Sequence, residues 1–108
     1  MNNLKINTHV RRVVVLGGTG FVGSEIILNL KKKNIPNKSI SRNDIDFSNK
    51  ESVQNLKFLL DENDAVVVAC ANAPVKNNSM LTSNIIMLEN IYNILLEKKV
   101  KKNTLYKL

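Results

Sequence analysis

The 108-residue sequence has few residues of several types, and each shortage excludes a class of protein. Cys70 is the only cysteine, so the chain forms no intrachain disulfide and no cysteine-based metal cluster, and we expect this thiol to be a small buried side chain. No apolar stretch is long enough to cross a membrane, and residues 1–10 lack the hydrophobic segment of a signal peptide. With 44% hydrophobic and 23% charged residues, the composition predicts a globular, cytoplasmic protein without a membrane partner.

Acidic residues are also scarce, which leaves a formal net charge of +7. Surfaces that bind nucleic acids combine such charge with stacking aromatic residues or a known motif, and neither accompanies these lysines. The lysines gather at 31–33 and between 98 and 102, where helices are expected to end and where cations complement the helix dipole. We therefore expect no specific nucleic-acid partner. His9 lies in a polar leader, residues 1–11, and no metal-ligand spacing occurs, so no metal site is expected.

The most informative segment that is present runs from Val13 to Gly23, where an apolar run leads into a glycine-rich turn and then into a helical pattern. Gly17 permits a sharp exit from the strand, and Gly20 lets backbone N–H groups approach a pyrophosphate. Gly23 allows the helix to lie close to the strand. Glycines at this spacing also occur in ordinary turns, but the strand before them and the helix after them favour a dinucleotide-binding turn.

Strand and helix patterns alternate along the rest of the chain. We expect strands at 13–16, 39–42 and 65–70, helices at 20–33, 49–60 and 81–99, a brief extended segment at 45–47, and a strand that begins at 103. Ser48-Asn49-Lys50-Glu51 is predicted to be a capping box with Ser48 as the cap. The inner stripe of the last helix is predicted to be Ile85, Leu88, Ile91, Tyr92 and Leu95. The alternation predicts an α/β fold with a Rossmann-type parallel sheet and flanking helices, in a single domain over 1–108.

Four segments, within residues 12–107, resemble the N-terminal half of an extended short-chain dehydrogenase/reductase. This family comprises nucleotide-sugar epimerases, dehydratases and reductases. The segments are the glycine motif Gly17-Gly18-Thr19-Gly20-Phe21-Val22-Gly23, the acidic segment Asp46-Phe47-Ser48-Asn49, the strand from Asp64 to Ala71, and the helix that carries Asn84 and Asn90. Two segments depart from the family pattern, because Met87-Leu88 stands where many relatives have Gly-Thr, and Asn72-Ala73-Pro74 extends a loop. By this resemblance the sheet is truncated near its fifth main strand.

The resemblance also implies a set of residues that bind the cofactor. Asp46 would contact the adenine ring, and the backbone of Phe47 would help to hold it. Small residues at the end of the fourth strand would let the ribose pass close to the backbone. The implied set is Gly17, Thr19, Gly20, Phe21, Val22, Gly23, Arg42, Asp46, Phe47, Ala69 and Ala71.

The end of the second strand bears on the choice between NAD and NADP. An acidic residue at this place holds the ribose 2′-hydroxyl of NAD, whereas an arginine can hold the 2′-phosphate of NADP. Arg42 lies at the expected strand end, and relatives that form GDP-fucose carry a similar arginine ahead of an aspartate-containing segment. Asp44 would reach the ribose instead if the loop differed by one residue, and Arg42 could equally be an exposed strand-end charge. The sequence favours NADP and leaves NAD open.

The catalytic residues of the family are missing from this chain. Hydride transfer in the family needs a tyrosine, a lysine four residues later and a serine or threonine. Leu96 stands four residues after Tyr92, and the position four after Tyr106 lies beyond the last residue. We read Tyr92 as a core residue and expect no catalytic residue and no activity from the chain alone.

Three hypotheses remain for what such a chain does. It is the nucleotide-binding part of a reductase or epimerase whose substrate region is absent, or a stand-alone NAD(P)-binding sensor, or a chain that completes its sheet by self-association or with a complementing chain. The open edge of the sheet is expected to lower the stability of the isolated chain.

Overall fold

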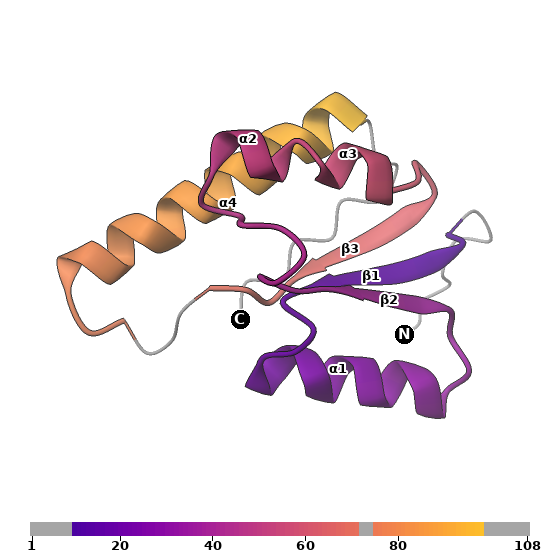
Figure 1. Ribbon diagram of the computed structural model, residues 1–108. Helices are drawn as coiled ribbons and strands as arrows, with labels where there is room; N and C mark the ends of the chain where they lie inside the picture. Colours follow the sequence, from indigo (N-terminus) through magenta and orange to yellow (C-terminus); the bar gives the residue numbers. More distant parts are fainter. Residues whose placement is uncertain (1–9, 72–74, 99–108) are drawn as a thin grey trace.

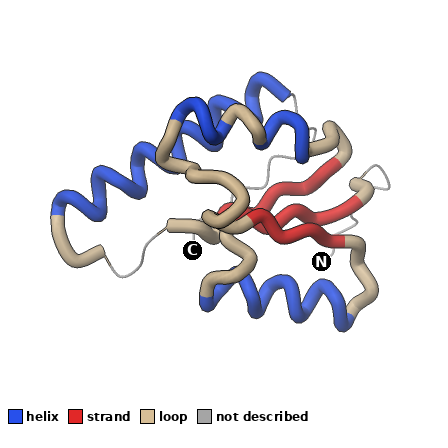
Figure 2. The backbone as a smooth tube through the Cα atoms, viewed as in Figure 1, coloured by secondary structure: helices blue, strands red, loops and turns tan. Residues whose placement is uncertain are grey.

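The computed structural model describes residues 10–71 and 75–98, which form a parallel sheet with helices on both faces (Figure 1). The strands are β1 (Arg12–Leu16), β2 (Asn37–Ile40) and β3 (Asp64–Val68), in the order β2-β1-β3. Both neighbouring pairs are parallel. The helices are α1 (Phe21–Lys32), α2 (Lys50–Val53), α3 (Leu56–Leu59) and α4 (Asn78–Lys98). Figure 2 shows the strands in red between the blue helices, so the prediction of a Rossmann-type parallel sheet is confirmed.

β1 and β3 are apolar from their second residue onward because the sheet is covered on both faces, whereas β2 reads Asn-Lys-Ser-Ile. α1 covers one face, while α2, α3 and α4 lie on the other (Figure 1). Val14 and Leu16 of β1 belong to the core under α4, together with residues of β2, β3 and the helices on that side. Val15 alternates to the α1 side and is also fully buried. A strand that buries both faces shows no polar alternation, which is why the bare apolar runs predicted β1 and β3 well.

The segment between β2 and β3 differs from the prediction in three ways. The expected helix over 49–60 is two short helices, α2 and α3, separated by a turn at residues 54–55. Its cap is Asn49 rather than Ser48, because the Asn49 side chain accepts hydrogen bonds from the backbone of Glu51 and Ser52, both at 2.9 Å. The Ser48 hydroxyl instead donates to Asp46. The expected extended piece at 45–47 is not a strand, although Ile45 and Phe47 are buried in the core.

The inner stripe predicted for α4 is wrong at two of its positions. Ile85 is 52% exposed and Tyr92 is 45% exposed, so neither belongs to the core. The buried face is formed by Asn84, Met87, Asn90, Ile91, Ile94 and Leu95. α4 has two apolar stripes on adjacent faces, and sequence periodicity alone cannot tell which of them meets the sheet.

Several predictions fall on residues outside the described ranges. They include the polar leader up to residue 9, the loop insertion at 72–74, and the strand expected from 103 with Tyr106. Within residues 10–71 and 75–98, no helix combines the length and the apolar character that a membrane crossing requires.

Candidate functional site

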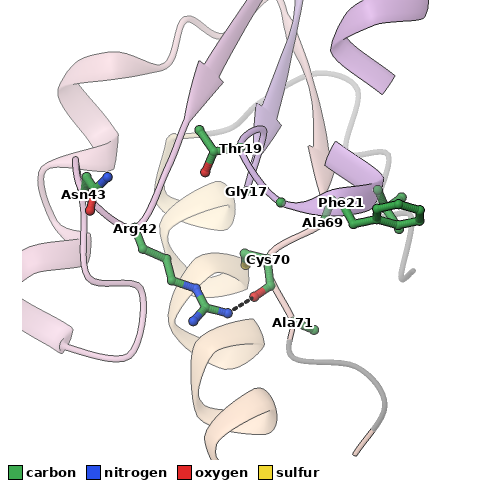
Figure 3. Close-up of a pocket in the computed structure, with 10 residues that line it drawn as sticks. Gly17, Thr19, Phe21, Arg42, Asn43, Ala69, Cys70 and Ala71 are labelled. Atoms are coloured by element: carbon green, nitrogen blue, oxygen red, sulfur yellow. Dashed lines mark hydrogen bonds between the residues drawn. The ribbon is translucent and has the colours of Figure 1, made fainter. Parts of the chain in front are cut away.

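A pocket of about 680 Å³ opens at the carboxyl ends of the parallel strands, where open α/β sheets bind their ligands (Figure 3). Its volume lies in the range of small-molecule sites. The glycine turn after β1, the turn after β2 and the chain after β3 all reach it. The lining residues are Gly17, Thr19, Gly20, Phe21, Val22, Arg42, Asn43, Ala69, Cys70 and Ala71. Eight of the residues that the sequence assigned to a cofactor therefore meet around one cavity, and Gly23 lies directly beneath it.

The glycine turn is held against the end of β3 by close backbone contacts. Gly17 has a φ of +91°, and a Cβ atom at this position would lie 2.7 Å from the carbonyl oxygen of Ala69. Hydrogen bonds from Gly17 N–H to the Ile40 carbonyl and from Ala69 N–H to the Leu16 carbonyl, both 2.8 Å, join the turn to the strand ends. Only glycine meets both the conformational and the steric demand here.

Gly20 and Gly23 lack a side chain for different reasons. A Cβ atom on Gly23 would lie 2.0 Å from the carbonyl oxygen of Gly17, so this glycine is needed for α1 to pack against the turn. A Cβ atom on Gly20 would meet only the Gly17 oxygen, at an ordinary 3.4 Å. No steric contact within the described chain excludes a side chain at Gly20; its place as the N-cap of α1 mildly favours glycine, and a ligand that presses on the backbone would require it.

The sequence interpretation missed a contact beneath the second glycine of the turn. A Cβ atom on Gly18 would lie 2.0 Å from the hydroxyl oxygen of Ser39, which belongs to β2. The Ser39 hydroxyl is buried and has no hydrogen-bond partner within the described residues. The pattern of the glycine motif gives no signal for this contact, because Ser39 comes from a different strand.

The electrostatics of the pocket suit an anion. α1 begins at the pocket with Gly20 as its N-cap, and no side chain of the described protein caps this end of the helix. The N–H groups of its first turn carry the partial positive charge of the helix dipole. Among the described residues that line the pocket, Arg42 alone is charged. A phosphate placed between them would meet positive potential from both sides.

Arg42 reaches across the carboxyl edge of the sheet. Its guanidinium donates a hydrogen bond of 3.1 Å to the carbonyl oxygen of Cys70, which joins the chain after β2 to the chain after β3 (Figure 3). The sequence places these residues 28 positions apart. The sheet order brings them together, because β1 alone separates β2 from β3.

Asp44, the residue that could have favoured NAD, is bound within its own turn. Its carboxylate accepts hydrogen bonds from the backbone N–H of Ser41 at 2.9 Å and from the Ser41 hydroxyl at 3.2 Å. The Ser41 carbonyl in turn accepts from the N–H of Asp44 at 3.0 Å. Asp44 does not line the pocket, and it serves to close the turn that carries Arg42 and Asn43.

Asp46 and Phe47, both assigned to the adenine ring, lie outside the lining of this pocket. The Asp46 carboxylate accepts from the backbone N–H and the hydroxyl of Ser48, and these hydrogen bonds lower its pKa. Phe47 is 1% exposed, and its carbonyl accepts a 3.0 Å hydrogen bond from the side chain of Asn90. The Phe47 side chain is therefore part of the core, and Asn90 fixes this loop to α4.

Two lining residues were not assigned to the site from the sequence. Asn43 follows Arg42 in the turn, and Cys70 stands between Ala69 and Ala71. Adjacency to predicted site residues was the one signal that could have identified them. Cys70 is buried as expected, and burial raises the pKa of its thiol to about 11, which keeps it protonated at neutral pH. Within the described residues, no group of three or more His, Cys, Asp or Glu side chains could hold a metal ion.

Known proteins with this fold include nucleotide-sugar enzymes. No protein-family model and no curated protein sequence matches the chain. A GDP-L-fucose synthetase from Naegleria fowleri, solved with NADP bound, superimposes with a TM-score of 0.72 and 23% identity. DdhaC superimposes with a TM-score of 0.75 and 21% identity. A GDP-6-OMe-4-keto-L-xylo-heptose reductase from C. jejuni superimposes with a TM-score of 0.73 and 17% identity.

Each comparison covers 91% of this chain and about a third of the solved protein, 31%, 30% and 30% respectively. At these sequence identities the structural similarity establishes the fold of the chain alone. The chain shares the Rossmann-type α/β architecture of the part of these proteins that it matches.

Proposed function

We propose that this chain is the NAD(P)-binding portion of a nucleotide-sugar reductase, epimerase or dehydratase, and that it prefers NADP. The observation that carries the first part is the open space at Gly20. This glycine lines the pocket, begins α1, and has room for a side chain as far as the protein itself is concerned. A pyrophosphate that contacts the backbone at this point accounts for its absence.

In this proposal, different residues at the strand ends bind different parts of the dinucleotide. The N–H groups at the start of α1, together with Gly17 and Gly20, would hold the pyrophosphate. Ala69 and Ala71 would let a ribose lie close to the backbone after β3, with Thr19, Phe21 and Val22 along the other wall. Gly23 would act by holding α1 near the turn. A bound nicotinamide would supply or accept a hydride.

Asp46 and the backbone of Phe47 remain our proposal for the adenine end. Phe47 would act through its backbone, since its side chain is in the core. The carboxylate of Asp46 is oriented by Ser48 and lies in the electrostatic field of Arg42. Both residues follow the turn that carries Arg42, so an adenine ring at this place would adjoin a phosphate held by the guanidinium.

The preference for NADP follows from the different roles of Arg42 and Asp44. The ribose 2′-hydroxyl of NAD needs an acceptor in the pocket, but Asp44 does not line the pocket, and Ser41 holds its Oδ2 within the turn. Arg42 lines the pocket and presents a planar set of donors that suits the 2′-phosphate of NADP. The NADP in the Naegleria fowleri structure agrees with this preference.

The test is a titration of the chain with NAD, NADH, NADP and NADPH, in which isothermal titration calorimetry measures the affinity for each nucleotide. We expect NADP and NADPH to bind more tightly than their non-phosphorylated counterparts. Arg42→Ala should weaken NADP binding by about 10- to 100-fold, as expected for the loss of a charged hydrogen bond, and should change NAD binding by less than about 3-fold.

Arg11→Ala is the matched control for this titration. It removes the same charge from an exposed arginine near the opposite end of the sheet, where Arg11 pairs with Asp61 at 3.3 Å. Equal losses of NAD and NADP affinity in the Arg42 variant would refute the specificity argument. No binding of any of the four nucleotides by a folded chain would refute the proposed function itself.

We also propose that the chain binds the cofactor without turning it over. The described part of the chain has one tyrosine, Tyr92, which lies on α4 with Leu96 rather than a lysine four residues later. Mixing the chain with NADPH and a GDP-4-keto sugar should leave the absorbance of NADPH at its starting value. Oxidation of NADPH at a rate proportional to protein concentration would contradict this expectation.

A further inference from the structure

Asp44 stands shortly after β2, where an acidic residue in an NAD-binding sheet holds the ribose, yet its carboxylate serves another group. The Oδ2 atom of Asp44 accepts from the backbone N–H of Ser41 at 2.9 Å and from the Ser41 hydroxyl at 3.2 Å. The two residues before it, Arg42 and Asn43, both line the pocket, whereas Asp44 does not. Asp44 is therefore placed to act on the pocket through its neighbours.

Residues 41–44 form a β-turn that hydrogen bonds close in both directions. The N–H of Asp44 donates to the Ser41 carbonyl at 3.0 Å, which is the bond typical of such a turn. The Asp44 carboxylate binds back to the N–H of Ser41, and the Ser41 hydroxyl accepts from the N–H of Asn43 at 3.2 Å. Ser41 is 6% exposed, so its polar groups depend on these partners rather than on water. These bonds hold the backbone of Arg42 and Asn43 in one conformation.

Arg42 is consequently fixed at both ends of its side chain. Its backbone lies within the closed turn, and its guanidinium donates to the Cys70 carbonyl at 3.1 Å (Figure 3). The residue before the turn is joined to the glycine turn, because the Ile40 carbonyl accepts from the N–H of Gly17 at 2.8 Å. An arginine side chain has many rotamers, and ordering an unrestrained one around an anion costs conformational entropy. A turn that fixes the base of the side chain lowers this cost.

We propose that Asp44 is a positioning residue for NADP, which closes the turn that presents Arg42 to the 2′-phosphate and does not accept from a ribose hydroxyl. The proposal rests on the proposed binding of NADP in this pocket. It gives Asp44 the opposite effect on selectivity from that of a ribose acceptor. Loss of a ribose acceptor shifts the selectivity toward NADP. Loss of a residue that positions Arg42 shifts the selectivity toward NAD.

Isothermal titration calorimetry of the full chain with NADPH and with NADH measures the selectivity, which is the dissociation constant for NADH divided by that for NADPH. Asp44→Ala should lower this ratio by about 5- to 20-fold, because Arg42 on a loosened turn loses more conformational freedom when it binds a phosphate. The affinity for NADH should change by less than about 3-fold, since NADH brings no 2′-phosphate to Arg42. Asp44 is exposed, so the substitution leaves no cavity in the core, and the circular dichroism should match that of the parent chain.

Asp44→Asn is the matched variant that separates the hydrogen bonds from the charge. Its amide oxygen can accept from the same two groups of Ser41, so the turn stays closed while the negative charge is lost. The selectivity should stay within about 3-fold of the parent, because the loss of one exposed charge has a small effect. Asp61→Ala is the control for an aspartate in another turn, since Asp61 accepts from the N–H of Asn63 at 3.0 Å. It should leave the selectivity unchanged.

Ser41 and Arg42 supply two further variants. Ser41→Ala removes the hydroxyl from the same turn and should lower the selectivity in the same direction by about 2- to 5-fold, as expected for the loss of a neutral hydrogen bond. In a chain that already carries Arg42→Ala, Asp44→Ala should cause no further loss of selectivity, because Asp44 acts through Arg42. The ratio compares two affinities of one variant, so a uniform weakening of the pocket cancels from it.

The other outcomes contradict the proposal in distinguishable ways. A higher ratio in both Asp44 variants would identify Asp44 as an acceptor for the ribose. Equal losses of NADH and NADPH affinity in Asp44→Ala would show that Asp44 only stabilises the fold. A loss in Asp44→Asn as large as that in Asp44→Ala, or a further loss on the Arg42→Ala background, would also overturn the positioning role. A folded parent chain that binds none of the nucleotides would instead refute the proposed function and this role with it.

Discussion

Alanine substitutions at Gly23 and Gly20 separate an effect on folding from an effect on binding. The added methyl group should mainly lower the stability of the fold at Gly23 and mainly weaken nucleotide binding at Gly20. Gly23→Ala would place a carbon atom 2.0 Å from the Gly17 oxygen, 2.8 Å from the Gly17 carbonyl carbon and 2.9 Å from the Gly18 Cα. All three neighbours are backbone atoms, so no side chain can turn aside. An ordinary contact begins at about 3.4 Å, and α1 would have to move away from the turn by more than ~1 Å to restore it.

We expect Gly23→Ala to lower the free energy of unfolding by about 3 kcal/mol, at the upper end of the cost of overpacking a closely packed site. For a domain of this size the midpoint of thermal unfolding should fall by roughly 10–20 °C. Differential scanning calorimetry and urea unfolding followed by circular dichroism would measure both quantities. Dinucleotide binding should weaken as well, because α1 supplies one wall of the pocket.

Gly20→Ala is the contrasting variant. Its methyl group meets a single protein atom, at 3.4 Å, so the free energy of unfolding should change by less than about 1 kcal/mol, mostly through the poorer N-cap. The affinity for NADPH should nevertheless fall by at least about 10-fold, because the added carbon stands where the proposal places the pyrophosphate. Unaltered NADPH affinity in this variant, or wild-type stability in Gly23→Ala, would refute the assignment of roles to the two glycines.

Three further predictions concern the rest of the fold. Asp64→Ala should lower the free energy of unfolding by about 2–4 kcal/mol in urea, because the fully buried carboxylate accepts from Arg12 at 2.8 and 3.1 Å and from the backbone of Asp61 at 2.7 Å. The free energy of unfolding should fall as the pH rises from about 9 to about 11, by roughly 2 to 3 kcal/mol at most, since the Cys70 thiol ionises near 9.0 when unfolded and near 11 when folded; Cys70→Ala should remove this loss in a pH series of urea titrations. Asn49→Ala should cost about 1 kcal/mol and Ser48→Ala clearly less in the same titrations, and equal costs would contradict the assignment of the cap.

The sheet could be predicted from the sequence because its signals are local. The runs at β1 and β3 are apolar on both faces, and a strand buried on both faces needs no partner to be recognised. The glycine turn is equally local, because a φ of +91° at Gly17 and the contact at Gly23 involve atoms within six residues of one another. Seven of the lining residues, five in the glycine motif together with Ala69 and Ala71, were assigned to the site from these local signals.

The features that were missed depend on which elements become neighbours. The buried hydroxyl of Ser39 under Gly18 and the reach of Arg42 to Cys70 both cross between strands, and no pattern within one strand encodes them. The N-cap moved by one residue because Ser48 had a competing acceptor in Asp46, two residues before it. Such competition between side chains is decided by the geometry of the loop, which the sequence motif does not specify.

α4 shows why hydrophobic periodicity misassigned part of the core. Periodicity assigned Ile85 and Tyr92 to the core together with Ile91 and Leu95, and the structure buries Ile91 and Leu95 but leaves Ile85 and Tyr92 about half exposed. A helix that needed only to cover its own sheet would require one apolar stripe. Since both stripes are apolar, hydrophobic periodicity could not select the one that packs against the core, and the packing of α4 against the neighbouring elements decides it.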